Sequence, residues 1–359
     1  MSQSNEAESS ATAKNTAPVT QTTSQNELGS SCGCNSTSPA VQAIGQSSEI
    51  GQGAFAASSA NQLGASNSSD PIRIGSYGND GSLTQENEAE SSASATNTAP
   101  VTQTGTQTQA PSRCGCSCGC SSGPAVKAIG QSSEIGQLAI GLSSATQIGA
   151  SNESGPIRIW SSGNGGSVSQ ENEAESTAAA TNTAPTTQSA TQTQAGSGVQ
   201  ALAQKSGIWQ GSFAASSATQ LPGRSKCGCG GGSSGNTADP VRIGSAGNDG
   251  ALKQENEASS NAAASNTAAP TQTGTQTQLS PKCGCSGLGV QALGQWSTVD
   301  QLAAALSSAK QIGASNSSDP TRVWSYGGGG YGHQSNEAES ASSAPNLARI
   351  LQAGQQIMV

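Results

Sequence analysis

Polar and small residues alternate with a period of two along most of the chain. From Gln85 to Gln109 the odd positions carry Gln, Asn, Ala, Ser and Val with one Gly, whereas the even positions carry mostly Glu, Ser and Thr. A period of two places successive side chains on opposite faces of a β-strand. The pattern therefore predicts a strand whose small and amide side chains face inward and whose Glu and Thr side chains face water.

The same pattern recurs along the chain as a long repeat. The block Gln-x-Asn-Glu-Ala starts at Gln3, Gln85, Gln170, Gln254 and Gln334, which by subtraction gives spacings of 82, 85, 84 and 80 residues. We therefore expect one continuous array of repeats of about 84 residues. Its units are repeat 1 (3–84), repeat 2 (85–169), repeat 3 (170–253), repeat 4 (254–333) and a partial fifth repeat or C-terminal tail (334–359).

Each repeat continues with a second segment rich in Ala, Ser and Gln and then with a third segment. In repeat 4 the second segment contains residues 297–313, which taken alone could form a helix, because Val299, Leu302 and Leu306 would share a face. The other copies keep the same two-residue parity over about twenty residues, which a helix would not do, so we predict a strand. The third segment is a Pro-Ile-Arg-Ile motif or a variant of it, and a Gly- and Asn-rich sequence that is typical of a tight turn follows.

Proline lies near the middle of every first segment, at Pro18, Pro100, Pro185 and Pro270. Proline lacks the N–H that a sheet ladder needs, and an unbroken strand of 25 residues would span roughly 80 Å at about 3.3 Å per residue. We therefore expect the chain to turn a corner at each of these prolines.

The composition is poor in residues that build a conventional core, with 32% hydrophobic and 3% aromatic residues. Stacked identical strands offer another source of stability, because Asn and Gln side chains can bond to their copies above and below while Ala lets two sheets approach closely. We predict an all-β fold of stacked long-strand repeats, a β-solenoid or a cross-β-like array; a disordered low-complexity chain is the alternative. The expected ladder residues are Gln85, Asn87, Ala89, Asn97 and Gln103.

In this ladder pattern the first segment of each repeat resembles the repeats of curli-type functional amyloids and related secreted β-solenoid fibre subunits. The resemblance covers roughly a third of the chain, while the repeat is several times longer and the cysteines are foreign to that family. It implies a structural role outside the cell, with no catalytic site and no cofactor.

The two ends of the array suggest self-assembly. Gln3 and Asn5 begin the first repeat, and Gln334, Asn336 and Ala338 begin the partial fifth. The fifth could pair with the first repeat of another copy and so build a head-to-tail homopolymer, because repeats that do not close on themselves form open filaments. A terminal cap on the array is the alternative.

Ten cysteines occur in Cys-Gly-Cys pairs between or beside the predicted strands. Disulfide cross-links are the first interpretation, since the cysteine count is even and the expected location is oxidising. A zinc or copper(I) site at Cys114, Cys116, Cys118 and Cys120 is the second, although the usual Cys-x2-Cys spacing is absent. The cross-linking candidates are Cys32, Cys34, Cys114, Cys116, Cys118, Cys120, Cys227, Cys229, Cys283 and Cys285.

Two further residue classes recur once or more in each repeat. Thr102, Thr104, Thr106 and Thr108 and their copies would stack into a flat array of hydroxyl and methyl groups, as in ice-binding solenoids, or would serve as ordinary exposed strand residues. The arginine of each third segment could pair with three glutamates of the first segment, which are Glu86, Glu88 and Glu90 in repeat 2, or could lie in solvent. The arginines are Arg73, Arg158, Arg242 and Arg322.

Charge and chemistry exclude several functions. Fourteen basic against twenty-two acidic residues give a net charge of −8, so we expect no nucleic-acid partner. No apolar run reaches the roughly 18–20 residues of a membrane span. His333 is the single histidine and has no nucleophile beside it, so we expect no enzyme. The first residues lack a signal-peptide pattern, so either the protein is cytoplasmic or its leader is absent from this sequence. With the fibre interpretation we expect the second case, an extracellular or cell-surface protein.

Overall fold

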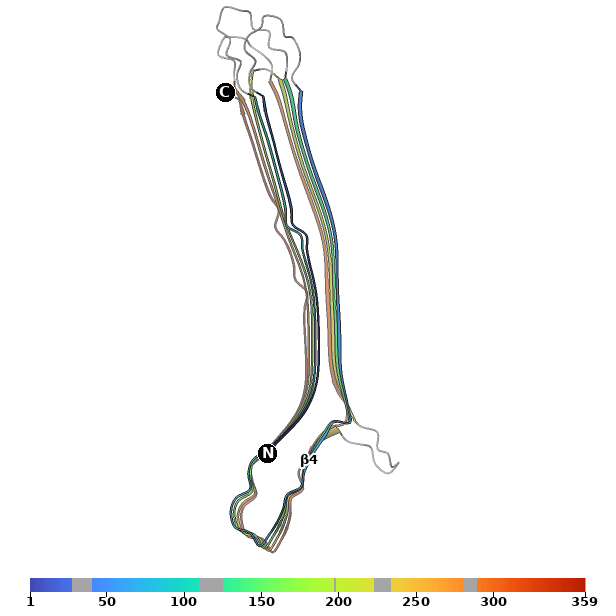
Figure 1. The fold of residues 1–359 in the computed structure, drawn as a ribbon, viewed down its shortest axis with the longest axis vertical. Helices are drawn as coiled ribbons and strands as arrows, with labels where there is room; N and C mark the ends of the chain where they lie inside the picture. Colours follow the sequence, from blue (N-terminus) through green and yellow to red (C-terminus); the bar gives the residue numbers. More distant parts are fainter. Residues whose placement is uncertain (28–40, 110–124, 197, 223–233, 280–288, 359) are drawn as a thin grey trace, which may run out of the picture.

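The computed structural model describes residues 1–27, 41–109, 125–196, 198–222, 234–279 and 289–358, and this part of the chain folds into parallel strands without a helix. Each turn of the chain runs through a long strand of a first sheet, a long strand of a second sheet and two short strands, and then returns one rung further along the stack. Figure 1 shows the two long sheets as two layers that face one another and are joined by an arch at one end. The predicted all-β fold of stacked long-strand repeats is confirmed.

The first long sheet has five rungs in chain order. They are formed by β1 (Ser2–Thr16) with β2 (Val19–Glu27), β6 (Leu83–Thr98) with β7 (Val101–Gln109), β11 (Val168–Ala195), β15 (Leu252–Leu279), and β19 (Gly332–Ser343) with β20 (Asn346–Ala348) and β21 (Leu351–Met358). The second long sheet has four rungs. They are β3 (Val41–Leu63), β8 (Ala125–Ile148), β12 (Gly198–Leu221) and β16 (Gly289–Gln311).

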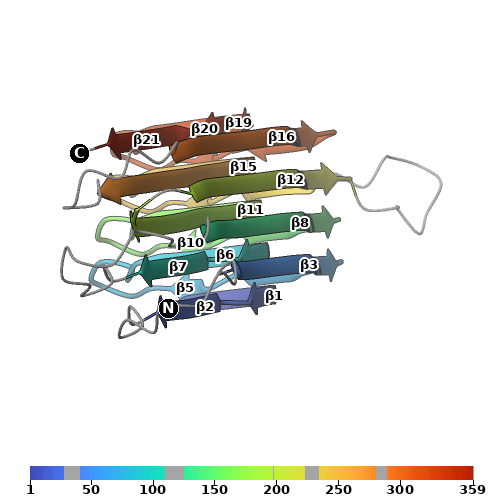
Figure 2. The same ribbon diagram turned by 90° about the horizontal axis from the view of Figure 1, so that it is seen from above.

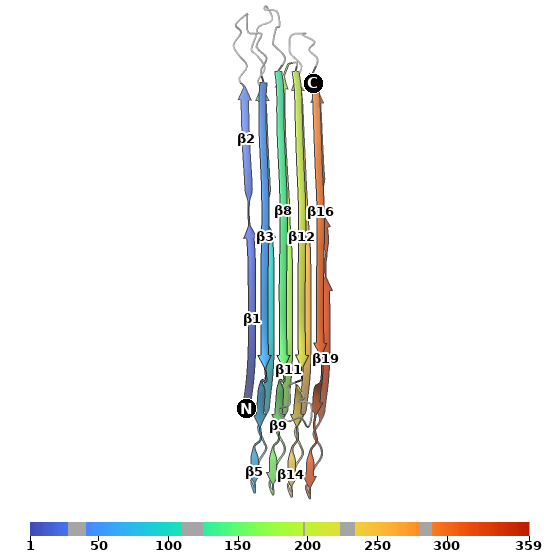
Figure 3. The same cartoon turned by 90° about the vertical axis from the view of Figure 1, so that its right-hand side faces the viewer.

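Two small sheets of four strands each form the arch. One contains β4 (Ser66–Ser69), β9 (Ser151–Ser154), β13 (Ser234–Ala238) and β17 (Ala314–Ser317). The other contains β5 (Ile72–Ile74), β10 (Ile157–Ile159), β14 (Val241–Ile243) and β18 (Thr321–Val323). In Figures 2 and 3 the rungs stack in sequence order, so the first and last rungs lie at opposite edges.

Strand register brings equivalent residues of the repeats together. Gln3 pairs with Gln85 and Asn5 with Asn87, and the same in-register pairing holds between all neighbouring rungs of the first sheet. Residues 334–358, predicted as a partial repeat, form the fifth rung of this sheet in the same register. The segment with the helical pattern is extended, and its residues 297–311 belong to strand β16.

The predicted corners at the prolines are wrong. β11 runs through Pro185 and β15 through Pro270 as strands of 28 residues, and β1 and β2 continue in one sheet on either side of Pro18. The amide of Ala17 bonds to Thr98 O at 3.0 Å and that of Val19 to Pro100 O at 2.9 Å, so the ladder resumes directly around the proline. A long row of neighbouring bonds tolerates the loss of one N–H. The chain turns instead at residues with positive φ, such as Gly64 (φ 63°) and Gly149 (φ 66°), which lie between the long and short strands.

The space between the long sheets is filled by small and amide side chains. Ten buried alanines form one cluster, and Ile50, Ile135 and Ile208 form the centre of another. Because alanine extends so little from the sheet, the two backbones lie close enough for amide side chains of one sheet to reach carbonyls of the other. The inward and outward faces follow the predicted parity along both long sheets.

Candidate functional site: amide columns that end at two open edges

Glutamines at equivalent positions of successive rungs form a hydrogen-bonded column. Gln85 Nε2 donates to Gln3 Oε1 at 2.9 Å, and Gln170 Nε2 donates to Gln85 Oε1 at 2.8 Å. The column continues through Gln254 to Gln334. Each amide nitrogen donates toward the N-terminal edge of the stack, and the column that contains Gln103 has the same direction.

The asparagine columns run in the opposite direction. Asn5 Nδ2 donates to Asn87 Oδ1 at 2.9 Å, and Asn87 Nδ2 donates to Asn172 Oδ1 at 2.8 Å. Asn67 of β4 donates to Asn87 Oδ1 at 3.2 Å and to Asn152 Oδ1 at 3.0 Å. Two asparagine columns, one from the first sheet and one from the arch, therefore interlock along the whole stack.

All five ladder residues expected from the sequence lie inside the solenoid, because Gln85, Asn87, Ala89, Asn97 and Gln103 are fully buried. Asn97 Nδ2 donates to Asn182 Oδ1 of the next rung at 3.0 Å and to Leu138 O of the facing sheet at 2.7 Å. The amide columns thus stabilise the stack in two directions, along the rungs and between the long sheets. Buried amides that are bonded in this way avoid the cost of an unpaired polar group.

A column of serines, not predicted from the sequence, also joins the two long sheets. Ser58 Oγ donates to Ser9 O at 2.7 Å, Ser91 Oγ to Ser58 Oγ at 2.9 Å, and Ser143 Oγ to Ser91 O at 2.8 Å. The same alternation between sheets continues to Ser307. The available signal was a serine at matching inward positions of the first and second segments.

The arch contains ion pairs between arginines and aspartates that the sequence pattern did not predict. Asp80 lies 2.7 Å from Arg73 Nη1 and 3.2 Å from Arg158 Nε, and Asp249 bridges two arginines of the later rungs in the same way. The arginine of each third segment therefore pairs with an aspartate of the arch and not with the Glu residues of the first segment. Arg158 and Arg242 are buried, whereas Arg73 and Arg322 of the outer rungs are partly exposed. The four stacked arginines are Arg73, Arg158, Arg242 and Arg322.

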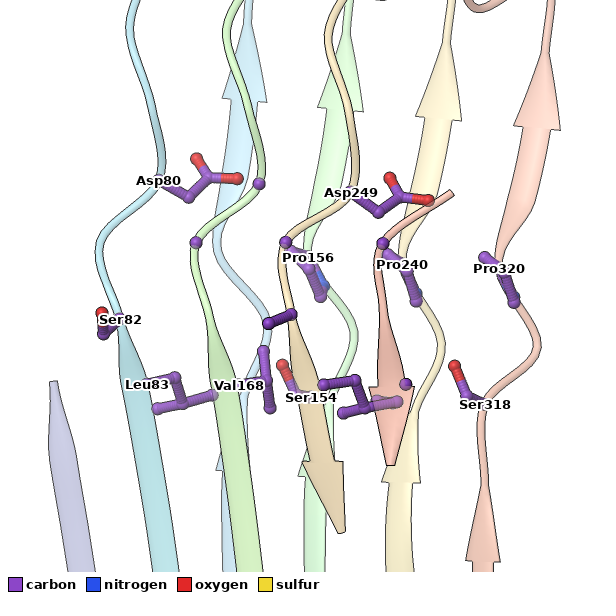
Figure 4. Close-up of a pocket in the computed structure, with 18 of the residues that line it drawn as sticks. Asp80, Ser82, Leu83, Ser154, Pro156, Val168, Pro240, Asp249, Ser318 and Pro320 are labelled. Carbon is purple, nitrogen blue, oxygen red and sulfur yellow. The ribbon is translucent and has the colours of Figure 1, made fainter. Parts of the chain in front are cut away.

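A cavity of about 580 Å³ lies behind these ion pairs and extends across several rungs. Figure 4 shows Asp80 and Asp249 on one side, with Pro156, Leu83 and Val168 further along the wall. The arginines bond to turn carbonyls such as Gly163 O and are paired with carboxylates. Arg158 Nε lies 3.2 Å from Asp80 Oδ2 as an ion pair and makes no hydrogen bond. Since its charged groups are ion-paired, the cavity belongs to the framework of the arch.

One buried column of the second sheet is interrupted by a lysine. Lys127 pairs in register with Gln42 and Gln200 and is 1% exposed, and its Nζ donates to Thr193 O at 2.7 Å. Burial lowers the pKa of Lys127 to about 8, although Glu27 opposes the shift. Gln42 Oε1 is buried without a hydrogen bond, because Lys127 supplies no amide in register with it.

The two edges of the first sheet carry the residues expected to mediate assembly. Gln3 and Asn5 lie in the first rung; Gln334, Asn336 and Ala338 lie in the fifth. Gln334 Nε2 donates down to Gln254, and Asn336 Oδ1 accepts from Asn256. In this pattern the last rung directs amide oxygens of its glutamines and amide nitrogens of its asparagines away from the stack.

Threonines form a regular array on the outer face of the first sheet. Thr102 pairs in register with Thr20, Thr187 and Thr271, and neighbouring columns contain further threonines. In the second rung the columns contain Thr102, Thr104, Thr106 and Thr108, and Thr104 pairs with Thr22 of the first rung and Ser189 of the third. All four side chains lie on the face opposite the buried Gln103 and Gln107.

The cysteine candidates, from Cys32 to Cys285, all lie outside the described residues. Within the described part of the chain no group of three or more His, Cys, Asp or Glu side chains is placed to hold a metal ion. His333 is exposed at the start of β19. No helix in the described ranges is long and apolar enough to cross a membrane.

Comparison with known proteins gives no relative. No family model matches the chain, and no curated protein and no solved structure matches it either.

Proposed function

We propose that the protein is a structural subunit that assembles head to tail into a fibre or layer outside the cell or at its surface. The observation that carries this proposal is the polarity of the amide columns. At a head-to-tail joint, Gln3 Nε2 of one copy would donate to Gln334 Oε1 of the next, while Asn336 Nδ2 would donate to Asn5 Oδ1. Both bonds follow the directions that hold inside the stack. A head-to-head joint would oppose like groups.

The backbone N–H groups of the first rung also favour a head-to-tail joint. Ala17 and Val19, which face inward, direct their amides to the second rung. In a parallel ladder alternate residues bond to opposite neighbours, so the outward-facing residues of β1 direct theirs to the open edge. An unprotected strand edge of this kind is a template for pairing with another chain.

A joint through the first sheet has a measurable signature. The first sheet has five rungs and the second has four in the described chain, so each joint would leave one strand position open in the second sheet. At about 4.8 Å per rung the copies would repeat every ~24 Å along the fibre. Helical diffraction should therefore show a spacing of about 24 Å in addition to that of the strands.

The test is a proline at the open edge. Ser10 faces outward in β1, and its amide is directed to the edge, so Ser10→Pro should block the joint while leaving the pairing of β1 with β6 intact. We expect long filaments of the unmodified protein in electron micrographs and single particles of the variant, with the same melting temperature.

Ser92→Pro is the matched control, since Ser92 is the register partner of Ser10 in β6. Its amide bonds inside the molecule, so this variant should melt at a lower temperature and still form filaments. Filaments of Ser10→Pro indistinguishable from those of the unmodified chain would contradict the head-to-tail joint.

The Cys-Gly-Cys pairs are proposed cross-links between rungs or copies. Oxidised cysteines would strengthen such a fibre, because a disulfide restricts the unfolded chain and joins copies covalently. Filaments that thin or shorten in reductant would support this role. Thiols that stay reduced while zinc co-purifies would support the metal site at Cys114–Cys120 instead.

The threonine array supports a second candidate function, the binding of ice. Its columns lie in register on a flat outer face, at strand spacings of about 4.8 Å by ~6.6 Å along the strand. Such a surface of regularly spaced hydroxyl and methyl groups could order water in a lattice.

Thermal hysteresis measures this function directly. Thr104→Tyr should abolish any hysteresis, because a large side chain disrupts the flat array. Ser144→Tyr, on the outer face of the second sheet, is the control and should leave it unchanged. The absence of hysteresis in the unmodified protein would exclude ice binding.

A further inference from the structure

The outer face of the second long sheet differs in chemistry from that of the first. Its centre carries exposed apolar side chains, with Phe55 61%, Leu302 68%, Leu306 60% and Trp209 51% exposed. The first sheet presents Glu, Ser and Thr at its corresponding face. We call the outward-facing residues 51–57 of β3 and their register partners in β8, β12 and β16 the apolar face.

Large and small residues alternate from rung to rung in two columns of this apolar face. One column reads Gly53, Leu138, Gly211, Leu302 from the first rung to the fourth, and the other reads Ala57, Leu142, Ala215, Leu306. The column between them, Phe55, Ile140, Phe213, Ala304, has large side chains in three rungs and a small one in the fourth. The column at the border of the face reads Gly51, Gly136, Trp209, Asp300, so it ends in a carboxylate that would lie opposite Gly51 of a second copy. The surface is therefore corrugated, with projections beside depressions.

The alternation makes this surface complementary to itself. If a second copy is rotated by 180° about an axis parallel to the strands, its fourth rung faces the first rung and its third faces the second. Leu302 of one copy then lies opposite Gly53 of the other, Leu306 opposite Ala57, and Phe55 opposite Ala304. A Cβ at Gly53 would meet no atom within 4 Å in its own chain, so this depression is open.

The second and third rungs fit in the same arrangement, with two features that limit the contact. Leu142 would lie opposite Ala215 and Trp209 opposite Gly136. Gly211 is already covered, because Leu138 and Trp209 of its own chain lie over it. Ile140 would lie opposite Phe213, the one pair in which both side chains are large.

Charges at the margin of the apolar face agree with the same rotation. Lys205 of the third rung would lie opposite Ser132 of the second rung, two residues along the strand from Glu134. A lysine and a glutamate separated by about 6.6 Å along a strand are within reach of an ion pair. The rotation would form this pair twice, once from each copy.

The outer face of the second sheet, which has the apolar face at its centre, is large enough for a stable contact. Strand β3 has 23 residues, so four rungs present an area of about 76 Å by ~19 Å, or roughly 1,400 Å². A stable interface covers about 800 Å² on each partner. The apolar face is roughly a third of this area, so the contact would extend beyond it to a little more than half of the outer face.

We propose that the apolar face binds a second copy of this chain in this antiparallel, two-fold arrangement. In fibres it would join two filaments of opposite polarity, and without fibres it would give a dimer. The contact is independent of the head-to-tail joint, which uses the strand edges and not this face. It would leave the acidic outer face of the first sheet in solvent.

The test exchanges a small residue, Gly53, and the large residue that would face it in the second copy, Leu302. Gly53→Leu should abolish the pairing, because its leucine would meet Leu302 of the second copy. Leu302→Ala should weaken it. The two substitutions together should restore it, since the leucine and the small residue then change places. Thr22→Leu, on the exposed outer face of the first sheet, controls for an added leucine.

The readout is the mass per unit length of filaments by scanning transmission microscopy, and the mass of unassembled protein by sedimentation. For the unmodified chain and for Thr22→Leu we expect filaments with the mass of two chains per repeat of ~24 Å, and dimers where no filaments form. For Gly53→Leu we expect the mass of one chain per repeat, and monomers. Recovery of at least half of the paired form in the double variant would support the arrangement. Unpaired unmodified protein, or pairing unaffected by Gly53→Leu, would overturn it, while absence of filaments alone would contradict only the head-to-tail joint.

Discussion

At the scale of single residues, the stability of this fold depends on whether each buried polar atom meets its copy in the next rung. In the Gln46 column Gln131 Nε2 donates to Gln46 Oε1 at 2.7 Å, and Gln204 continues the column. At Lys127 the column is broken, since an ammonium group can donate to Thr193 O but cannot accept from a neighbouring amide. One substitution in one rung therefore affects the rungs above and below it.

Lys127→Gln should stabilise the protein by about 1–2 kcal/mol at pH 7, because it removes a buried charge and supplies a donor for Gln42 Oε1. The lowered pKa of about 8 also predicts a pH effect. Between pH 8 and 10.5 the unfolded chain binds this proton more tightly than the folded chain, so stability should rise with pH. Thermal unfolding of the variant should lack that rise. Lys14→Gln, at an exposed position of the first rung, should change neither quantity.

At the scale of the elements, the two-residue parity was sufficient to predict the long strands, their inward faces and the register of the repeats. It was sufficient because identical residues recur at identical positions, as in Asn87 and Asn172, which leaves one register that satisfies every column. Parity says nothing of how many missing ladder bonds a strand of 28 residues tolerates. For that reason the prediction at Pro185 failed.

The contacts between residues of different segments could not be predicted from the sequence pattern. Asp80 follows the third segment by a few residues, and nothing in the alternation indicates that the turn folds its carboxylate back onto Arg73 and Arg158. The alternation of Gly53 with Leu138 is visible in the sequence only after the register is known. Features that depend on the stacking of different residues required the structure.

At the scale of the whole molecule, charge is distributed unequally between the two outer faces. Five glutamates, one from each rung, stack in register on the first sheet. They are Glu6, Glu88, Glu173, Glu257 and Glu337. The second sheet carries its apolar face on the other side. This asymmetry favours lateral contact through the second sheet and opposes it through the first.

The glutamate stack predicts that stability falls as the pH rises. Burial, followed by the charges of Glu257 and Glu171, raises the pKa of Glu173 to about 7, and burial and neighbouring carboxylates raise the pKa of Glu88 and Glu257 as well. Between pH 4.5 and 7 the folded chain binds these protons more tightly than the unfolded chain, so stability is highest at the acidic end of this range and is lost toward its upper end.

The melting temperature should therefore be higher at pH 5 than at pH 8, and added salt should reduce the difference by screening the stacked carboxylates. Glu173→Gln should stabilise the protein at pH 8 by about 1 kcal/mol, after allowance for solvent screening, and should flatten the pH profile. Glu153→Gln is the control, because its register partner Thr237 carries no charge. A profile that rises between pH 5 and 8, or an equal effect of both substitutions, would show that repulsion within the stack does not limit the stability of the solenoid.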